Sequence, residues 1–205
     1  MTIKPLPPGL KFFGNLVDLD SHIQDLKLVL SKTEEIEFPQ HKESLYEESL
    51  ITDIHPRITR EGFIVILLIA LDTQFKVFCE ILKLATRQNL NWTDLRGSSL
   101  ERFITYSVKV CGLDSVCDDL IRQKLRGLIE MRNCIIHNNS CLDGFSKHKL
   151  IEEFSKNTEG MNIEDGYITL EIEACLICAD LVFSFMEYAY HHALEKYPHS
   201  QQSTK

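Results

Sequence analysis

The fold class is decided by residues 59–88, TREGFIVILLIALDTQFKVFCEILKLATRQ. The first half of this stretch is apolar all round, which is typical either of a helix buried on several sides or of a buried strand. From Phe75 to Ala85 apolar residues recur at spacings of three and four, and no turn residue interrupts them. We therefore predict one long central helix with Thr59 as its N-cap.

Start and stop signals place further elements around this helix. Ser98 and Glu101 fit a capping box, in which each side chain bonds the other residue's free backbone N–H, and Gly112 marks a helix stop. The Asp165-Gly166 turn in the alternating stretch MNIEDGYITL indicates a small β-hairpin before the last helix. Five longer helices are expected over residues 18–35, 59–88, 98–111, 114–137 and 171–196, and short ones over 42–54 and 147–155. Pro56 is expected to interrupt the helical structure between residues 54 and 59.

These elements define an all-α protein, an antiparallel bundle of five to six helices with at most one hairpin. Two strands cannot form the parallel sheet of a nucleotide-binding α/β fold, and the sequence has no glycine-rich phosphate loop. The 205 residues suit one domain. We expect an extended arm over 1–15, a single helical domain over 16–196 and a flexible tail over 197–205.

Composition limits the partners. The net charge of −8 repels phosphate at long range, which argues against indiscriminate binding to nucleic acid or anionic membrane. The longest apolar run, residues 63–71, is shorter than the roughly 20 residues of a membrane helix, so we expect a cytoplasmic protein that binds no membrane. The seven cysteines are interpreted as reduced thiols, and Cys175 and Cys178 as core residues rather than metal ligands.

One charged residue stands where helical spacing favours an apolar one. At about 100° per residue, Arg132 falls in the middle of a stripe formed by Leu125, Leu128 and Ile135. A guanidinium carries five donors and is costly to bury without a partner. Arg132 therefore snorkels, forms an ion pair in the core, or faces a second subunit and an anionic ligand.

His137 and Asn133 lie on another side of the same helix, as neighbours at i and i+4. Arg132 and His137 can converge only if the helix distorts near Ile136 or if two copies of it cross at a dimer interface. A histidine transfers protons near neutral pH, and an arginine stabilises the added charge of a phosphoryl transition state. Because RNA supplies its own 2′-hydroxyl nucleophile, this set suffices for RNA cleavage without a metal or cofactor.

The local charge favours phosphate binding at this helix. Residues 122–149 carry a net charge of +4, and the rest of the chain carries −12. A basic patch on an acidic protein concentrates phosphate binding in one place. Lys124, Arg126 and Asn138 are the candidates for contacting RNA. Each candidate also has a structural alternative: the cations can form a solvated face, the arginine of the stripe an internal ion pair, and the histidine a helix end.

Residues 131–139, MRNCIIHNN, resemble the signature of the HEPN (higher eukaryotes and prokaryotes nucleotide-binding) family. In that signature an arginine, a polar residue and then a histidine lie on a late helix of an all-α domain. Arg132, Asn133 and His137 match it, with four residues between the arginine and the histidine. The resemblance covers about residues 15–195 and implies a HEPN-like fold.

The resemblance implies a metal-independent endoribonuclease that acts as a homodimer. His137 would transfer protons, Arg132 would bind the scissile phosphate, and Asn133 would orient the reacting groups. The products would carry a 2′,3′-cyclic phosphate and a 5′-hydroxyl. Many such proteins are toxins or act in phage or stress defence, which implies an antitoxin or regulatory protein as a partner. Other family members are non-catalytic modules that bind nucleotide, RNA or protein, and this is the alternative function.

Overall fold

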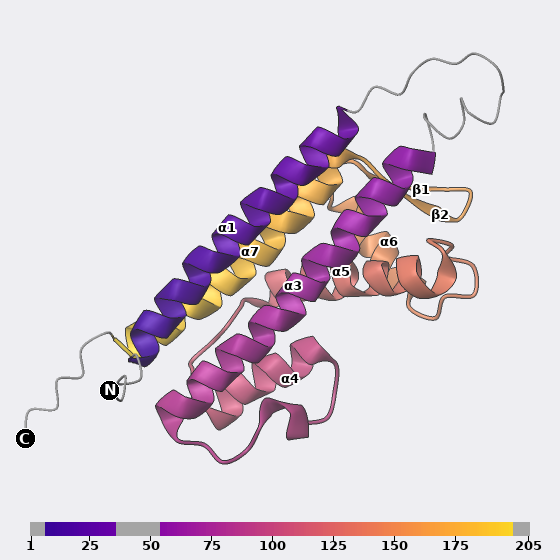
Figure 1. Cartoon of the computed structure of the whole chain (residues 1–205). Helices are drawn as coiled ribbons and strands as arrows, with labels where there is room; N and C mark the ends of the chain where they lie inside the picture. The colour runs from indigo at the N-terminus through magenta and orange to yellow at the C-terminus, as the bar shows by residue number, and fades with distance from the viewer. Residues whose placement is uncertain (1–6, 36–53, 199–205) are drawn as a thin grey trace, which may run out of the picture. The chain divides into compact units, whose positions relative to one another are not determined.

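The computed structural model describes residues 7–35 and 54–198, and within them the fold is all-α with one small antiparallel hairpin (Figure 1). A 3₁₀ turn spans Trp92–Asp94, and a π-helical turn over Tyr106–Val110 continues α4 (Ser99–Thr105). The helices and the single hairpin confirm the predicted all-α fold class. The main elements are α1 (Pro8–Glu34), α3 (His55–Thr86), α4 (Ser99–Thr105), α5 (Asp119–Asn138), α6 (His148–Lys156), β1 (Met161–Glu164), β2 (Tyr167–Leu170) and α7 (Ile172–Lys196).

The hairpin forms where the turn sequence predicts it. β1 and β2 pair antiparallel, and Glu164 opposes Tyr167 at the turn. Asp165 has φ 49° and Gly166 has φ 81°, and two positive φ angles are what a type I′ turn requires. The hairpin prediction is therefore confirmed.

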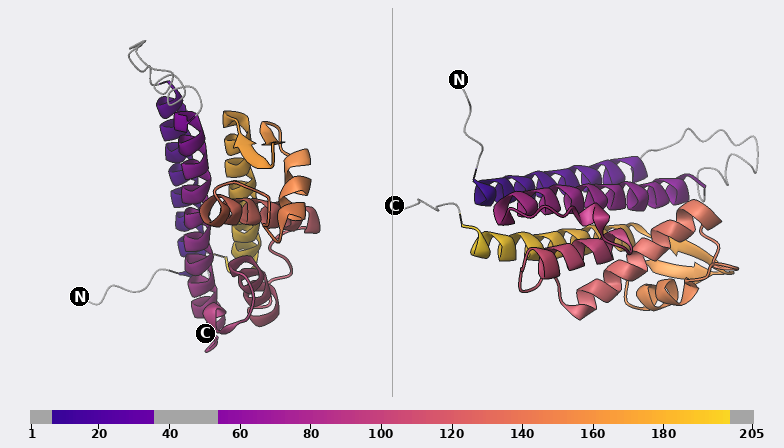
Figure 2. Two further views of the ribbon diagram at one scale, coloured as in Figure 1. Left: turned by 90° about the vertical axis from the view of Figure 1, so that its right-hand side faces the viewer. Right: turned by 90° about the horizontal axis from the view of Figure 1, so that it is seen from below.

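The described residues cluster into two compact units. Unit 1 contains residues 7–22, 70–122 and 183–198, and unit 2 contains 23–35, 54–69 and 123–182. Segments of α1, α3 and α7 belong to both units, and α1 runs antiparallel to α3 and α7 (Figures 1 and 2). A single domain over 16–196 stays a prediction.

Unit 1 is built on an aromatic core. Phe75 stacks on Phe103 with 4.4 Å between ring centroids, and Tyr190 meets Phe78 edge-on at 5.0 Å. Phe12 is fully buried and lies 5.2 Å from the Phe78 ring. The prediction of an extended arm over 1–15 is therefore wrong from residue 8 onward, because α1 begins at Pro8 to bury this phenylalanine.

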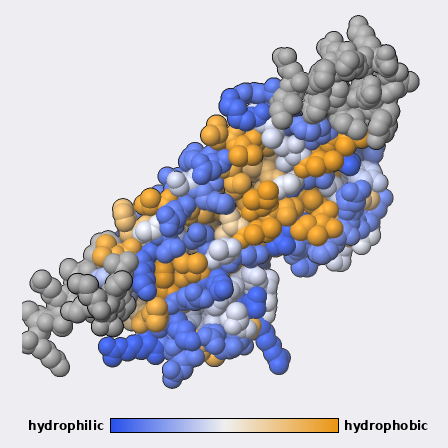
Figure 3. Space-filling model, in the orientation of Figure 1, coloured by the Kyte–Doolittle hydropathy of each residue, from blue (hydrophilic) through white to orange (hydrophobic). Residues whose placement is uncertain are grey.

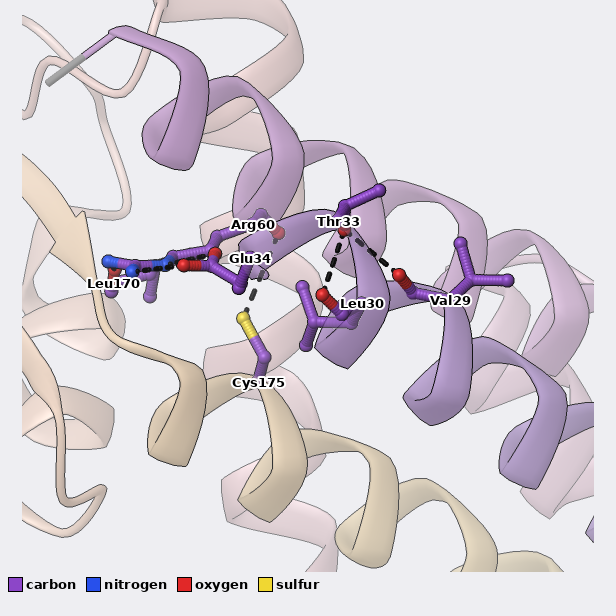
Figure 4. Close-up of polar contacts among 7 residues, drawn as sticks. All are labelled: Val29, Leu30, Thr33, Glu34, Arg60, Leu170 and Cys175. Atoms are coloured by element: carbon purple, nitrogen blue, oxygen red, sulfur yellow. Dashed lines mark hydrogen bonds and ion pairs between the residues drawn. The ribbon is translucent and has the colours of Figure 1, made fainter. Parts of the chain in front are cut away.

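Unit 2 is held together by a polar contact as well as an apolar core. Arg60 of α3 donates two hydrogen bonds to the Glu34 carboxylate, at 2.8 and 2.7 Å, and a third to the backbone oxygen of Leu170 at 2.9 Å (Figure 4). The hydrogen bonds to Glu34 raise the pKa of the Arg60 guanidinium above its ordinary value. One side chain thus joins the end of α1, the start of α3 and the end of β2.

Two further helix starts differ from the predictions. Pro56 does not break the chain but lies in the first turn of α3, where its missing N–H costs nothing. α5 begins at Asp119 rather than at residue 114, because the Asp118 carboxylate accepts the backbone N–H of Ile121 at 2.7 Å. Residues 42–53 of the expected short helix and 199–205 of the expected tail lie outside the described residues.

α3 contains a long apolar stretch. By length and composition it is able to cross a membrane, although 44% of its most apolar 18-residue window is buried inside the fold. A count of uninterrupted apolar residues misses this, because a few polar residues divide the helix. Exposed apolar side chains follow α1 and α3 (Figure 3), namely Leu10, Phe13, Val17, Leu28, Val29, Ile58, Ile66, Ile69 and Leu84. The cytoplasmic location stays a prediction.

Candidate functional site on helix α5

The buried face of α5 is rotated away from Arg132. At about 100° per residue, the centre of this face lies roughly 80° from Arg132, which is half-buried at its edge. Ile136 on the other side of Arg132 is 46% exposed. On the helical wheel Arg132 thus lies between the fully buried Leu125 and Leu128, and the predicted apolar stripe is open to solvent on its Ile136 side. The residues that α5 buries are Leu125, Gly127, Leu128, Met131 and Cys134.

Gly127 explains this rotation. A Cβ atom at Gly127 would lie 2.5 Å from the Cβ of Phe154 and 3.1 Å from the backbone oxygen of Leu150, both on α6. Only a glycine allows α6 to approach α5 so closely at this point. The helix therefore turns its glycine side, with Met131 and Cys134, toward the core of unit 2.

Arg132 and His137 do not share a face of α5. The helix is regular through Asn138, so the distortion near Ile136 that would bring them together is not found. They are about 140° apart around the axis and about 7.5 Å apart along it. His137 is exposed to solvent, whereas Arg132 is half-buried and takes part in an interaction within the chain. The arrangement within one copy is therefore not found, and the crossing of two copies stays a prediction.

Asn133 is oriented by a carboxylate. Its Nδ2 donates to Oε2 of Glu130 at 3.2 Å, and Nζ of Lys147 lies 2.5 Å from Oε1 of the same carboxylate. The Glu130 side chain is only 12% exposed. A negative charge therefore lies within the candidate site, and Glu130 belongs among its residues. Its position three residues before Asn133 on a helix is the sequence signal for this contact.

Asn138 has a structural role at the end of α5. Its side-chain amide donates to the backbone oxygens of Cys141 and, at 3.1 Å, Asp143. The next two residues, Asn139 and Ser140, have φ angles of 50° and 62°, in the left-handed region that most side chains avoid. The amide thus stabilises a strained turn after the helix, and its contact with RNA stays a prediction.

Ser140 attaches this turn to α3. Its hydroxyl donates to Oε1 of Glu61 at 2.5 Å, and its backbone N–H donates to the oxygen of Cys134 at 3.3 Å. Ser140 is 1% exposed, so its hydroxyl is not accessible to a substrate. The end of α5 that carries His137 is therefore held in a fixed direction.

The cations proposed to guide RNA are only partly accessible. Lys124 and Arg126 are both half-buried, and Arg126 takes part in an interaction within the chain. Lys147 and Lys149, by contrast, are exposed on and beside α6. The exposed lysines near α5 therefore lie at the start of α6 rather than at the two predicted positions, and one of them, Lys147, is paired with Glu130.

The cysteine pair behaves as a core element. Cys175 and Cys178 are fully buried in α7, and burial raises the pKa of the Cys175 thiol to about 12. Among the described residues there is no group of three or more His, Cys, Asp or Glu that could hold a metal ion. A protonated thiol buried among apolar neighbours is a packing residue, as the sequence predicts.

No family model, no curated protein and no solved structure matches this chain. The HEPN resemblance therefore stays a prediction based on Arg132, Asn133 and His137. The geometry adds that one copy of α5 offers a half-buried guanidinium and an exposed imidazole on different sides. An arrangement of this kind can act on one phosphate when a second copy supplies the missing group.

Proposed function

We propose that the protein is a HEPN-type, metal-independent endoribonuclease whose active site is composed at a homodimer interface. The proposal rests on one observation: the Arg132-Asn133-x₃-His137 pattern lies on a regular, late helix of an all-α chain, with its imidazole exposed. The arginine of one protomer and the histidine of the other meet at the RNA phosphate. The proposed role is that of a cytoplasmic toxin or an antiviral or stress-defence RNase, controlled by an antitoxin or regulatory protein.

The reaction needs only RNA and these side chains. The His137 imidazole removes the proton of the 2′-hydroxyl, and the 2′ oxygen attacks the neighbouring phosphorus. Arg132 of the other protomer stabilises the charge that develops on the phosphate oxygens. The bond from phosphorus to the 5′ oxygen breaks, and the imidazolium gives its proton to this leaving oxygen. The products are a 2′,3′-cyclic phosphate and a 5′-hydroxyl.

The second candidate is a non-catalytic helical module that binds nucleotide, RNA or a protein partner through the same helix. The observation that favours it is the Glu130 carboxylate, which neutralises Lys147 and holds the Asn133 amide. A carboxylate beside the candidate phosphate ligands weakens their attraction for RNA. The net charge of −8 acts in the same direction.

The deciding experiment is RNA cleavage in the presence of EDTA by the wild type and by the variants Arg132→Ala and His137→Ala. Circular dichroism verifies that each variant is folded. His191→Ala is the matched control, because this histidine of α7 is exposed and lies outside α5. We expect cleavage products with cyclic phosphate ends from the wild type and the control, and none from the two α5 variants. Cleavage that survives in both α5 variants contradicts the proposal.

A further inference from the structure

Unit 1 contains an open pocket of about 250 Å³ that the proposed nuclease reaction does not use. One wall is α3, which contributes Lys76, Glu80 and Lys83 over two helical turns. The opposite wall is the loop after α3, with Trp92 as its largest side chain. Tyr106, at the start of the π-helical turn, completes the lining. The volume of the pocket accommodates a single aromatic ring with one small substituent.

The bottom of the pocket is uncharged. Tyr106 is fully buried, and its hydroxyl donates to the backbone oxygen of Leu90 at 2.9 Å. Cys79 beside it is 1% exposed. Burial raises the pKa of both the phenol and the thiol, so both hold their protons at neutral pH. The pocket therefore combines an apolar, neutral interior with charges at its rim.

The rim is positive in a chain that is negative overall. Two lysines and one glutamate line the pocket, while the whole chain carries −8. Lys83 donates a hydrogen bond to Oδ1 of Asn91 at 2.5 Å. Because the amide of Asn91 is neutral, this bond does not cancel the charge of the Lys83 ammonium. In the part of the chain that the structure describes, Lys76 makes no hydrogen bond or ion pair and is exposed. Lys76 is thus the cation available to a ligand.

The Trp92 side of the pocket is fixed before any ligand arrives. The Arg102 guanidinium lies 5.0 Å from the centroid of the Trp92 ring. The backbone N–H of Asn91 donates to the Asp94 carboxylate at 2.9 Å, which closes the turn that carries the tryptophan. A pre-formed aromatic wall lowers the entropic cost of binding a flat molecule.

We propose that this pocket binds a small aromatic carboxylate, with its ring against Trp92 and its carboxylate on Lys76. A flat apolar ring packs against the Trp92 side chain, a contact that an inorganic anion does not make. A single negative charge matches the net charge of +1 that Lys76, Lys83 and Glu80 give the lining. The site lies in unit 1, so it is independent of the proposed nuclease reaction on α5 in unit 2.

The test uses the single tryptophan of the chain, whose indole N–H gives one nitrogen–proton NMR signal. Benzoate is titrated into the full-length protein, and its matched probes are benzamide, which lacks the charge, and acetate, which lacks the ring. We expect a saturable shift of the indole signal with benzoate, and at least about tenfold weaker binding of benzamide and of acetate. No saturable shift with benzoate, or equal binding of benzoate and benzamide, overturns the proposal.

A variant pair then locates the charge. Lys76→Gln removes the ammonium of the pocket, and Lys109→Gln removes an exposed lysine of unit 1 that does not line it. We expect benzoate to bind at least about tenfold more weakly to Lys76→Gln and with unchanged affinity to Lys109→Gln. Equal affinity of the Lys76 variant and the wild type contradicts the assignment.

Discussion

Asn133 donates its side-chain amide to Glu130, with 3.2 Å between Nδ2 and Oε2, and so points away from His137, one turn further along α5. The same carboxylate binds Lys147 at 2.5 Å. The site proposed to receive an RNA phosphate therefore contains a negative charge that binds two of its hydrogen-bond donors.

Replacing Glu130 by glutamine tests what this charge does. We expect Glu130→Gln to bind labelled RNA about 3- to 10-fold more tightly at low salt, because the ammonium of Lys147 becomes available to phosphate and a repulsion is removed. Fluorescence anisotropy at 50 and 200 mM salt measures this. Glu153→Gln is the control, since the carboxylate of Glu153 on α6 accepts a hydrogen bond from the neutral Gln123. Unchanged or weaker binding by Glu130→Gln argues against RNA at this site.

Replacement by alanine is predicted to have opposite effects on stability at Gly127, where α5 contacts α6, and at Gly62 of α3. Gly127→Ala is expected to destabilise the protein by about 1–3 kcal/mol, because its new Cβ would overlap Phe154. Gly62→Ala on α3 meets nothing within 4 Å and is expected to stabilise it by about 0.5–1 kcal/mol. Urea unfolding of both variants gives the two values. A tolerated alanine at 127 would show that α6 does not approach α5 as described.

The buried ion pair of unit 2 predicts a second contrast in stability. Arg60→Ala is expected to lower the free energy of unfolding by about 2–3 kcal/mol, because it leaves the Glu34 carboxylate, whose side chain is 14% exposed, without its donors. Lys32→Ala removes an exposed ion pair with Glu35 and should change the free energy of unfolding by less than about 0.5 kcal/mol. Thermal and urea unfolding distinguish the two, and equal effects would contradict the role assigned to Arg60.

Thiol reactivity should depend on pH through Cys117. Burial raises the pKa of this half-buried thiol to about 11, so only about one in a thousand molecules carries its thiolate at pH 8. We expect its alkylation rate to rise about tenfold per pH unit between pH 8 and 10. Cys178, which is fully buried, should react only after unfolding. Mass spectrometry after iodoacetamide treatment measures both, and a rate for Cys117 that does not change with pH contradicts the assigned environment.

Local rules predict the elements whose ends are set by neighbouring residues. The Ser98 capping box forms as expected, with the Ser98 hydroxyl accepting the backbone N–H of Glu101 at 3.3 Å. Gly112 ends the following helical segment with φ 74°. The two-residue turn of the hairpin is equally local. These features depend on contacts within a few residues, so the sequence is sufficient to place them.

Long-range packing decides what the sequence does not predict. α1 begins ten residues earlier than expected because Phe12 packs on Phe78, which is far along the chain. The buried face of α5 is centred away from Arg132 because Gly127 admits α6. Lys147, which follows α5 after a loop, forms an ion pair with Glu130 of α5. Helical spacing alone carries no information about these partners.

The central claim is that Arg132 and His137 act on one phosphate from different protomers, and mixing the two inactive variants tests it most directly. After equal amounts of Arg132→Ala and His137→Ala are mixed and allowed to exchange subunits, half of the dimers contain both kinds of chain. Each mixed dimer then has one intact site and one site without either group. We predict that RNA cleavage returns to about one quarter of the wild-type rate. A mixture as inactive as each variant alone would contradict the composite site.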